Sequence, residues 1–427
     1  MQFEWPSAAG LAGIQRTRKR LAVERAMRAP YYKVRLTGLD LDKLDDPQTW
    51  TRIPTLTKEE LRQIPSAEFH STFCIEPRTR VVEYWRSGGV TGRPFFYPRS
   101  AEDLQYGLLS FRRGWALVGA TPDDCVHISF PLGIHPVGHL YARTAEDLGI
   151  GTVWCGAGSN TPSMMQLELI QELKPTIWAG MASYGLHLAN LAEAAGIDLK
   201  GCSVRKIIVA AEPLSPAKRE KLERMWGAEV FDHFGMTEAG FVAGEGSTHS
   251  GMHVWSDLYH VEVVDEQGLP VPQGEVGSLT ITPLFTNCIT PFLRWNSGDL
   301  VRLLPPSQTD GPLSVFPILR HERRTVAFFK VRGVNIGHPE LEDLMFSNRD
   351  ITDFKAEVFA TDVGLDVLRL SVEPYRGLDT GNVIASVRAN VARVFQINPE
   401  VVALAPGTIG TEFEASVKAA RFVDRRD

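Results

Sequence analysis

Cysteine is scarce in this chain, and nothing in its arrangement points to disulfides. The five cysteines are odd in number and scattered, without a Cys-x-x-Cys pair: Cys74, Cys125, Cys155, Cys202 and Cys288. Such usage is typical of free thiols in a reducing cytosol. The first residues, MQFEWPSAAG, lack a charged leader followed by an apolar core, so we expect no secretory signal. The sequence therefore predicts a cytoplasmic protein.

Long apolar runs and long basic runs are also missing. No apolar run reaches the about 20 residues that a bilayer crossing requires. The net charge is −6 and no long basic block occurs, which argues against a nucleic-acid or membrane-surface partner. With 427 residues, of which 44% are hydrophobic, the chain has enough apolar material for two or more domains with proper cores.

The middle of the chain alternates between short apolar runs and helical segments. An N-terminal helix is expected first, over residues 8–30 and ending at Pro30. Strand-like runs then lie at residues 127–130, 152–155, 176–180 and 207–209, and helix-like segments at residues 139–148, 162–173 and 183–195. Alternation of this kind predicts a parallel sheet with helices on its faces.

The pattern changes twice toward the C-terminus. After Gly251, apolar runs separated by Gly/Pro turns predict antiparallel β structure. Beyond about residue 323, two strands within 354–372, a helix over 382–395 and a strand at 401–404 predict a small α+β domain. The expected fold class is α/β. A large N-terminal domain, residues 1–322, holds parallel sheets flanked by helices plus a β-rich subdomain, and a C-terminal domain, residues 323–427, follows.

Two acidic loops are predicted to meet at one edge of the parallel sheet. The run at 207–209 leads to Glu212, and the next strand-like run leads to Thr237 and Glu238. Between the two runs, Ser215 suits a helix N-cap, so the segment reads as strand, helix, strand. Ligands bind at the carboxyl ends of the strands in open α/β sheets. The sequence thus points a hydroxyl and two carboxylates at one place.

A glycine-rich segment at residues 87–94, SGGVTGRP, is the strongest companion signal. Its glycines let the backbone bring N–H groups close to an anion, while Ser87 and Thr91 add hydroxyl donors and Arg93 a cation. That chemistry suits a polyphosphate, although the segment is neither a Walker A loop nor a GxGxxG motif. A glycine-rich hairpin between two strands is the alternative interpretation.

Three further segments carry groups that suit the same chemistry. Asp299 ends residues 292–299 and could grip vicinal hydroxyls, residues 332–336 read RGVNI, and Lys418 lies in the C-terminal tail. Each is weak alone, because a Gly-Asp pair is usually a turn and a C-terminal lysine is usually solvated surface. Because they occur in this order and at these spacings, we interpret these segments together with the glycine-rich and Thr-Glu segments as one set of motifs.

Together these motifs resemble those of the adenylate-forming superfamily, which includes acyl-CoA synthetases, luciferases and nonribosomal adenylation domains. The resemblance is greatest to the phenylacetate–CoA ligase branch and covers nearly the whole chain, from PYYKVRL and LTKEELR through AAEP and RGVN to KAARFVDRR at the end. It implies ATP-dependent activation of an aromatic or arylacetic-type acid to an acyl-adenylate with release of pyrophosphate. Transfer to CoA would then give an acyl-CoA thioester.

The resemblance also implies a role for each matching residue. Thr237 would contact the α-phosphate and Glu238 would hold Mg²⁺. Lys418, on a mobile C-terminal domain, would stabilise charge as the carboxylate attacks. The implied nucleotide-binding set is Ser87, Gly88, Gly89, Thr91, Gly92, Arg93, Ala211, Glu212, Pro213, Phe234, Gly235, Asp299 and Arg324. After domain rotation the CoA-side loop would be Arg332, Gly333 and Asn335.

The acid pocket is expected beside the same loops. The resemblance suggests a lining of Phe130, Gly133, His135, Gly138, Met181, Ser183, Ala210 and Phe234. This lining is mostly apolar and aromatic, which suits an aryl or arylacetic acid. His135 and His139 lie one helical turn apart, and a place on the helix surface or hydrogen bonding to substrate is favoured over a catalytic role.

The chain departs from the family pattern at several of these positions. Gly88 and Val90 stand where hydroxyl residues are usual, Phe234 where a tyrosine is usual, and no acid follows Arg324 at the hinge. The altered hinge and the missing phosphate-loop hydroxyls each leave an alternative open. One is an adenylating enzyme that passes the acyl group to a carrier protein, an amine or another acceptor. The other is a non-catalytic nucleotide-binding homologue.

The expected ligands are ATP, Mg²⁺, a carboxylic acid and, with the altered hinge in mind, either CoA or a carrier protein. Many members of the branch also carry a cysteine-rich zinc site. Here His249 and His253 have no cysteine near them, and two ligands fall short of the four of a structural zinc. We therefore expect no structural zinc. Homodimers are common in the branch, and the sequence leaves the oligomeric state open.

Overall fold

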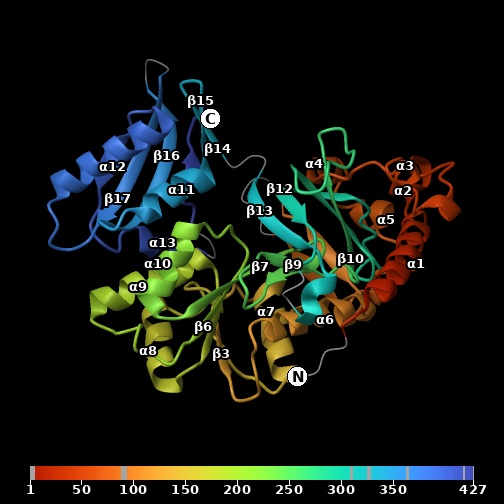
Figure 1. The fold of residues 1–427 in the computed structure, drawn as a ribbon, viewed down its shortest axis with the longest axis horizontal. Coiled ribbons are helices and arrows are strands. Elements are labelled where there is room, and N and C mark those ends of the chain that lie inside the picture. Colours follow the sequence, from red (N-terminus) through yellow and green to blue (C-terminus); the bar gives the residue numbers. More distant parts are fainter. Residues whose placement is uncertain are drawn as a thin grey trace. The chain divides into compact units, whose positions relative to one another are not determined.

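The structure is a computed structural model that describes residues 5–87, 94–307, 311–324, 328–361, 365–416 and 419–426 (Figure 1). The chain forms two compact units. The first unit comprises residues 1–123, 132–151 and 231–325, and the second comprises residues 124–131, 152–230 and 326–427. Among the described residues, none of the helices combines the length and apolar character that a bilayer crossing needs.

The first unit begins with a series of mostly short helices. They are α1 (Ala8–Ala26), α2 (Pro30–Arg35), η1 (Leu41–Lys43), α3 (Pro47–Trp50), α4 (Lys58–Arg62), α5 (Phe69–Phe73) and η2 (Arg78–Arg80). The predicted helix over residues 8–30 is therefore too long. It ends at Ala26, and Pro30 begins α2 because proline suits the first helical position. The aromatic side chains of Tyr32, Phe73 and Phe292 lie at the centre of this region's core.

A β-hairpin and two longer helices follow in the first unit. Strands β1 (Glu83–Arg86) and β2 (Phe96–Arg99) pair antiparallel. Helix α6 (Ala101–Leu117) starts at a capping box formed by Ser100 and Asp103, and it packs against α7 (Pro136–Asp147). The buried Arg113 of α6 makes two hydrogen bonds, of 2.8 and 2.6 Å, to the carboxylate of Asp257, which fixes α6 to the β-rich part of the unit.

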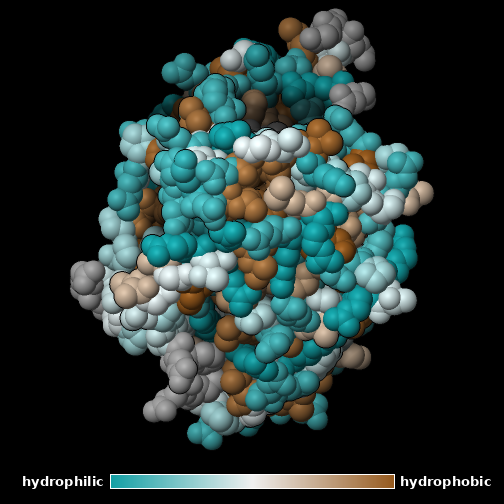
Figure 2. Space-filling model, turned by 90° about the vertical axis from the view of Figure 1, so that its right-hand side faces the viewer, coloured by the Kyte–Doolittle hydropathy of each residue, from teal (hydrophilic) through white to brown (hydrophobic). Residues whose placement is uncertain are grey.

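The β-rich part of the first unit is an antiparallel sheet. Its strands are β7 (Glu229–Met236), β8 (Gly240–Glu245), β9 (Met252–Val254), β10 (Tyr259–Val264), β11 (Val276–Pro283), β12 (Trp295–Leu304) and β13 (Ile318–Arg324), with η3 (Gly311–Val315) before the last. The neighbours run in the order β10-β11-β12-β13-β9-β8-β7. The antiparallel region predicted after Gly251 is confirmed. The face shown in Figure 2 mixes hydrophobic and hydrophilic residues closely, as folded protein surfaces do.

The second unit contains the predicted parallel strands and their helices. The order is β6-β5-β3-β4, and β3, β5 and β6 pair in parallel. Each predicted element is present within three residues of its expected bounds: β3 (Cys125–Ile128), β4 (Gly151–Trp154), α8 (Ser163–Leu173), β5 (Ile177–Gly180), α9 (Ala182–Ala195), β6 (Lys206–Val209) and α10 (Pro216–Trp226). Ser215 caps α10 by accepting from the Lys218 N–H at 3.2 Å, and Gly227 ends it at φ 66°.

The C-terminal part of the second unit is the predicted α+β region. A four-stranded sheet has the order β18-β17-β16-β19, and β14 and β15 form a separate hairpin. The elements are β14 (Phe328–Val331), β15 (Val334–Gly337), α11 (His338–Ser347), β16 (Ile351–Ala360), β17 (Asp366–Pro374), α12 (Thr380–Phe395), β18 (Glu400–Ala403), η4 (Ile409–Thr411), α13 (Glu412–Ala415) and β19 (Phe422–Asp424). One hydrophobic core joins this part to α8, α9 and α10.

Candidate active site

The predicted phosphate loop joins the two strands of the β1–β2 hairpin. Ser87 lies at its base, where the Ser87 N–H donates to the Phe95 carbonyl at 3.0 Å and the Ser87 Oγ accepts from the Phe95 N–H at 3.1 Å. Ser87 is 3% exposed. The other predicted members, Gly88, Gly89, Thr91, Gly92 and Arg93, lie outside the described residues. The alternative interpretation is a glycine-rich hairpin between two strands, and the strands β1 and β2 are present. Their antiparallel pairing brings the two ends of the glycine-rich segment close together.

The predicted Thr237–Glu238 pair lies in the tight connection between β7 and β8. These strands pair antiparallel, and a Cβ on Gly235 would lie 2.6 Å from the Gly240 carbonyl oxygen, so only glycine fits this approach. Arg99, at the end of β2, donates from Nη2 to the carbonyl oxygens of Thr237 and Glu238, each at 2.7 Å. The strand that follows the glycine-rich loop is therefore bonded directly to the Thr237–Glu238 turn.

Arg99 itself is buried among polar partners and an aromatic ring. Its Nη1 donates to Thr290 Oγ1 at 2.6 Å, and its guanidinium carbon lies 4.7 Å from the Trp85 ring centroid. Burial lowers the pKa of Arg99, and the carboxylates of Asp103 and Glu238 act in the opposite direction. The arginine ties together β1, β2 and the Thr237–Glu238 turn, a role that no local sequence pattern indicated.

The carboxylate of Glu238 is held by a tyrosine from the same hairpin. Tyr97 donates its hydroxyl to Glu238 Oε1 at 3.0 Å, and both side chains are buried. Burial, followed by the charge of Glu238, raises the pKa of Tyr97 well above its usual value, so the phenol stays a donor. A carboxylate oxygen is a hard ligand of the kind that Mg²⁺ prefers, so the side chain of Glu238 has the chemistry to hold that metal.

Asp299 and Phe234 meet at a histidine that the sequence did not single out. Asp299 lies in β12 opposite Arg324 of β13, and its Oδ1 is 3.1 Å from His321 Nε2. The His321 ring lies 6.1 Å from the Phe234 ring. Nothing is described of the Arg324 side chain. The β12–β13 register brings His321 to Asp299, and that register was not predictable from local patterns.

In the second unit, Ala211, Glu212 and Pro213 follow β6 as predicted. Ala211 has φ 70°, an uncommon conformation for a residue with a Cβ and one that often marks functional loops. Glu212 accepts hydrogen bonds from the Ser183 N–H at 2.5 Å and from Ser183 Oγ at 2.9 Å. Ser183 lies in the first turn of α9, where a helix favours an anion. Glu212 therefore binds the start of α9, and Ser183 is its partner.

The predicted acid-pocket residues are divided between the units. In the first unit, Gly133 and His135 line a hollow of about 240 Å³ together with Tyr84, Trp85 and His139. Arg86 Nη1 lies 3.3 Å from His135 Nε2, and burial followed by the Arg86 charge lowers the pKa of His135. His135 is therefore neutral near pH 7.

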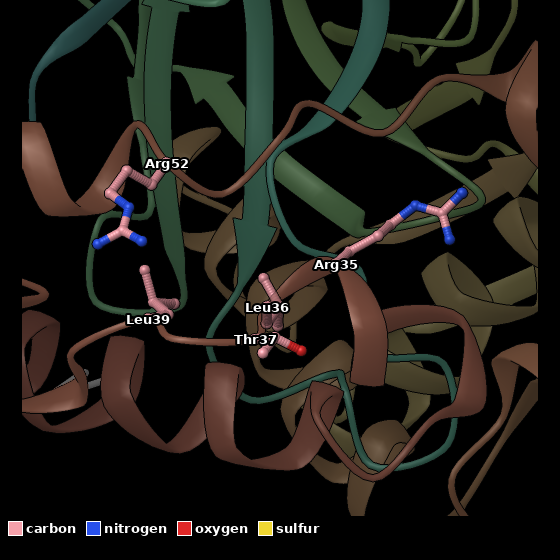
Figure 3. A pocket seen from close by; sticks show the side chains of 5 residues that line it. All are labelled: Arg35, Leu36, Thr37, Leu39 and Arg52. Atoms are coloured by element: carbon pink, nitrogen blue, oxygen red, sulfur yellow. The ribbon is translucent and has the colours of Figure 1, made fainter.

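The remaining members of the predicted lining, other than the half-buried Phe234, are buried. Gly138 lies in α7 of the first unit, and the second-unit members are Phe130, Met181, Ser183 and Ala210. Another hollow lies in the first unit near the N-terminal helices, lined by Arg35, Leu36, Thr37, Leu39 and Arg52 (Figure 3). Its volume of about 30 Å³ has room for a water molecule but not for an organic acid.

The predicted CoA-side loop is the turn of the β14–β15 hairpin. Arg332 and Gly333 have positive φ, 48° and 84°, and Asn335 pairs with Lys330 across the hairpin. Arg332 Nε donates to the Asp366 carbonyl at 2.9 Å. Lys418 lies outside the described residues. Within the part of the chain that the structure describes, no cluster of three or more His, Cys, Asp or Glu side chains forms a metal site.

Known proteins resemble the chain over most of its length. Residues 87–283 match the family model described as AMP-binding enzyme. The chain is 28% identical to the phenylacetate-coenzyme A ligase of Escherichia coli (strain K12) over 352 residues, which is 80% of this chain and 77% of that protein. It is 29% identical to the phenylacetate-coenzyme A ligase of Thermus thermophilus over 368 residues, 83% of this chain and 79% of that protein.

A solved structure shares the fold. The crystal structure of 2-hydroxyisobutyryl-CoA ligase in the postadenylation state, in complex with R3-HIB-AMP, has a TM-score of 0.86 at 23% identity, covering 99% of this chain and 90% of that chain. The same ligase with 2-HIB-AMP and CoA in the thioesterification state gives a TM-score of 0.68. At this level of identity the likeness shows the fold, and it confirms the predicted α/β class.

Proposed function

We propose that the protein is an AMP-forming acid–CoA ligase. The premise is that the chain is phenylacetate–CoA ligase-like, with an AMP-binding domain across residues 87–283. It activates an aromatic or arylacetic-type carboxylic acid with ATP, releases pyrophosphate, and transfers the acyl group from the acyl-adenylate to CoA. The curated relatives that support the reaction class are ligases of phenylacetate and coenzyme A. Free cysteines support a cytoplasmic location.

One observation carries the proposal. The Thr237–Glu238 turn is bonded through Arg99 and Tyr97 to the strand that leaves the glycine-rich loop. An ATP whose β- and γ-phosphates lie on that loop would have its α-phosphate near Thr237 and its Mg²⁺ near Glu238. Phosphoryl-centre chemistry requires such positioning together with neutralisation of developing charge. The magnesium ion, once bound, supplies part of that neutralisation.

The other site residues take their proposed roles around this centre. Asp299, oriented by His321, binds the ribose hydroxyls with Arg324 nearby. Ala211 and Pro213 lie along the adenine. Lys418 stabilises charge as the carboxylate attacks the α-phosphorus. Besides these residues, the proposed contacts with ATP come from Ser87, Gly88, Gly89, Thr91, Gly92, Arg93, Glu212, Phe234 and Gly235.

The choice of CoA as the acceptor of the acyl group depends on the C-terminal part of the chain. We propose that residues 323–427 act as a mobile domain and that Arg332, Gly333 and Asn335 face CoA in the second half-reaction. The 2-hydroxyisobutyryl-CoA ligase has been crystallised both in a postadenylation state and, with CoA, in a thioesterification state, which supports two successive arrangements. A carrier protein or an amine is the competing acceptor, because residues 326–328 read Val-Ala-Phe where an acid is usual.

Pyrophosphate exchange tests the first half-reaction. Wild-type protein with Mg-ATP and a panel of aryl and arylacetic acids, phenylacetic acid included, should exchange labelled pyrophosphate into ATP. Lys418→Ala should slow this exchange by about 10²- to 10³-fold, the typical cost of removing one group that stabilises developing charge. The matched control is Lys43→Ala, because that lysine is 71% exposed; its rate should equal that of the wild type.

Two outcomes would contradict the proposal in different ways. Absence of exchange with every acid, while ATP still binds, would favour a non-catalytic nucleotide-binding protein. Exchange without thioester formation on addition of CoA would favour another acceptor. A Lys418→Ala variant with the wild-type exchange rate would remove that lysine from the mechanism while leaving the reaction class intact.

A further inference from the structure

A chain of five alternating charges runs through the interior of the second unit. It passes from Glu212 to Lys218 of α10, Glu342 of α11, Arg421 and Asp353 of β16. Lys218 Nζ lies 3.5 Å from Glu212 Oε1 and 2.9 Å from Glu342 Oε1. Arg421 Nε lies 3.6 Å from Glu342 Oε1, and Arg421 Nη1 donates to Asp353 Oδ1. The five side chains are between 2% and 11% exposed.

Burial on this scale ties the charges to one arrangement. Removing a charge from water costs several kcal/mol, and the cost is offset only while each charge keeps its partners. Burial alone would lower the pKa of Lys218, but the carboxylates of Glu212 and Glu342 outweigh it and raise the pKa, so the lysine is charged. The Arg421 guanidinium carbon also lies 4.9 Å from the Phe346 ring centroid and 5.0 Å from that of Phe354.

The chain of charges ends beside the tail that carries the proposed catalytic lysine. Arg421 follows Lys418 by three residues. Its carbonyl oxygen accepts from the Ala356 N–H at 2.8 Å, and β19 then pairs in parallel with β16. Both the backbone and the side chain of Arg421 are therefore held in place.

A second anchor holds the tail on the other side of Lys418. The Phe413 ring stacks on the His187 ring at 5.1 Å and 25°. Both carboxylate oxygens of Glu414 lie 3.3 Å from the Ser163 N–H at the start of α8, where Pro162 offers no side-chain cap. Glu414 thus caps a helix 251 residues away in sequence. In the sequence, Lys418 thus lies between two anchored positions, residues 413–414 and Arg421.

The opposite end of the charge chain is the loop after β6. Glu212 joins Lys218 there and also accepts from Ser183, next to Ala211 in its strained conformation. The loop that is proposed to lie along the adenine and the tail that carries Lys418 are therefore connected by one network of buried ion pairs.

We propose that Arg421 is a positioning residue for adenylate formation: through Glu342 and Lys218 it ties the tail that carries Lys418 to the Glu212 loop. The inference rests on the proposed function, in which Lys418 acts on the attacking carboxylate and ATP. Arg421 does not contact the reacting atoms. Its loss should slow the step that uses Lys418 and spare the step that does not.

The test separates the two half-reactions in Arg421→Gln. Adenylation is measured by pyrophosphate exchange with the best acid of the panel, and thioester formation is measured separately from added acyl-adenylate and CoA. We expect kcat for exchange to fall on the order of 10²-fold, the effect of a misplacement of about 1 Å. The KM for ATP and the thioester rate should stay within about twofold of wild type. The matched control is Arg425→Gln, which removes an ion pair of a 60% exposed arginine with Glu357 and should change neither rate.

A double-mutant cycle asks whether Arg421 acts through Lys418. If it does, Lys418→Ala combined with Arg421→Gln should exchange no more slowly than Lys418→Ala alone. Arg421→Lys keeps the buried positive charge, and its single ammonium is unable to reach Glu342 and Asp353 as the guanidinium does. This variant should fold even if Arg421→Gln does not, and it should show a smaller loss confined to exchange.

The outcomes distinguish this proposal from the proposed function. A wild-type protein without exchange for every acid would defeat the function itself. If wild type exchanges and Lys418→Ala abolishes exchange, then wild-type exchange in folded Arg421→Lys would overturn the positioning role alone. Additive losses in the double mutant, or an equal loss of thioester formation, would overturn it as well.

Discussion

Replacing Arg99 by methionine tests the link between the glycine-rich hairpin and the Thr237–Glu238 turn. Methionine keeps a long apolar stem against Trp85 but removes three hydrogen bonds: one of 2.6 Å to Thr290 and two of 2.7 Å to the carbonyls of Thr237 and Glu238. Because Arg99 is 0% exposed, water does not replace the lost donor. The Glu238 carbonyl would be left buried without a donor, and the partly buried Thr237 carbonyl would lose its bond to Arg99.

The magnitude follows from the kind and number of these bonds. A hydrogen bond to a charged group contributes about 1.5–3 kcal/mol, so three would give roughly 4–9 kcal/mol if they were independent. They share one guanidinium and are not independent, and burial of the methionine stem returns part of the loss. We therefore expect the free energy of unfolding to fall by about 4 kcal/mol. The KM for ATP should rise because the turn that carries Glu238 loses both of its hydrogen bonds from Arg99.

Urea unfolding and pyrophosphate exchange measure the two effects. The matched control is Arg52→Met, since Arg52 is exposed and donates one 3.3 Å hydrogen bond to the Gly38 carbonyl; it should stay within about 0.5 kcal/mol of wild type. A loss below about 1 kcal/mol in Arg99→Met, together with an unchanged KM for ATP, would refute the reasoning. It would mean that the turn keeps its position without the hydrogen bonds from Arg99.

Two further predictions concern titration and the ribose contact. Burial lowers the pKa of His127 to about 4. Between about pH 6.5 and pH 4 the unfolded chain therefore binds a proton that the folded chain does not. As the pH falls through this range, this group lowers the free energy of unfolding by about 1.4 kcal/mol per pH unit. His127→Asn should flatten the measured slope by that amount, and an unchanged slope would contradict the assignment. Asp299→Asn should raise the KM for ATP about tenfold or more, because a charged acceptor for ribose hydroxyls becomes neutral; an unchanged KM in exchange assays would exclude Asp299 from the ribose contact.

Much of the fold follows from local patterns in the sequence. The alternation of strands and helices between residues 126 and 230 is governed by apolar periodicity, and helix ends such as Ser215 and Gly227 carry side chains or backbone freedom suited to caps. The same rules fail where a proline is compatible with either the end of one helix or the start of the next. The sequence predicts that Pro30 ends one helix, but Pro30 begins the next, since proline is unfavourable inside a helix and favourable at its first position.

The parts of the site that sequence reasoning missed depend on pairing between distant segments. His321 reaches Asp299 only because β13 pairs with β12 in one register, and a shift of one residue would turn it to the other face. Arg99 meets Thr237 across 138 residues. Neither contact leaves a trace in composition or spacing. The residues that bear the proposed chemistry were predictable from motifs, whereas the residues that hold them in place were not.

In each unit a network of buried charged or polar side chains holds a loop that is proposed to bind ATP. In the first, Arg99 and Tyr97 are buried against Glu238; in the second, Lys218 and Arg421 are buried in the charge chain that ends at Glu212. Replacing a buried ion pair by well-packed apolar residues is often neutral or stabilising, so stability alone does not explain the charge chain of the second unit. Each network joins a loop to a segment far away in sequence and makes any displacement of that loop costly. We infer that both serve to fix loop geometry. Replacing the Lys218–Glu342 pair by two methionines leaves Glu212 and Arg421 each with one ion-pair partner fewer, so pyrophosphate exchange should fall.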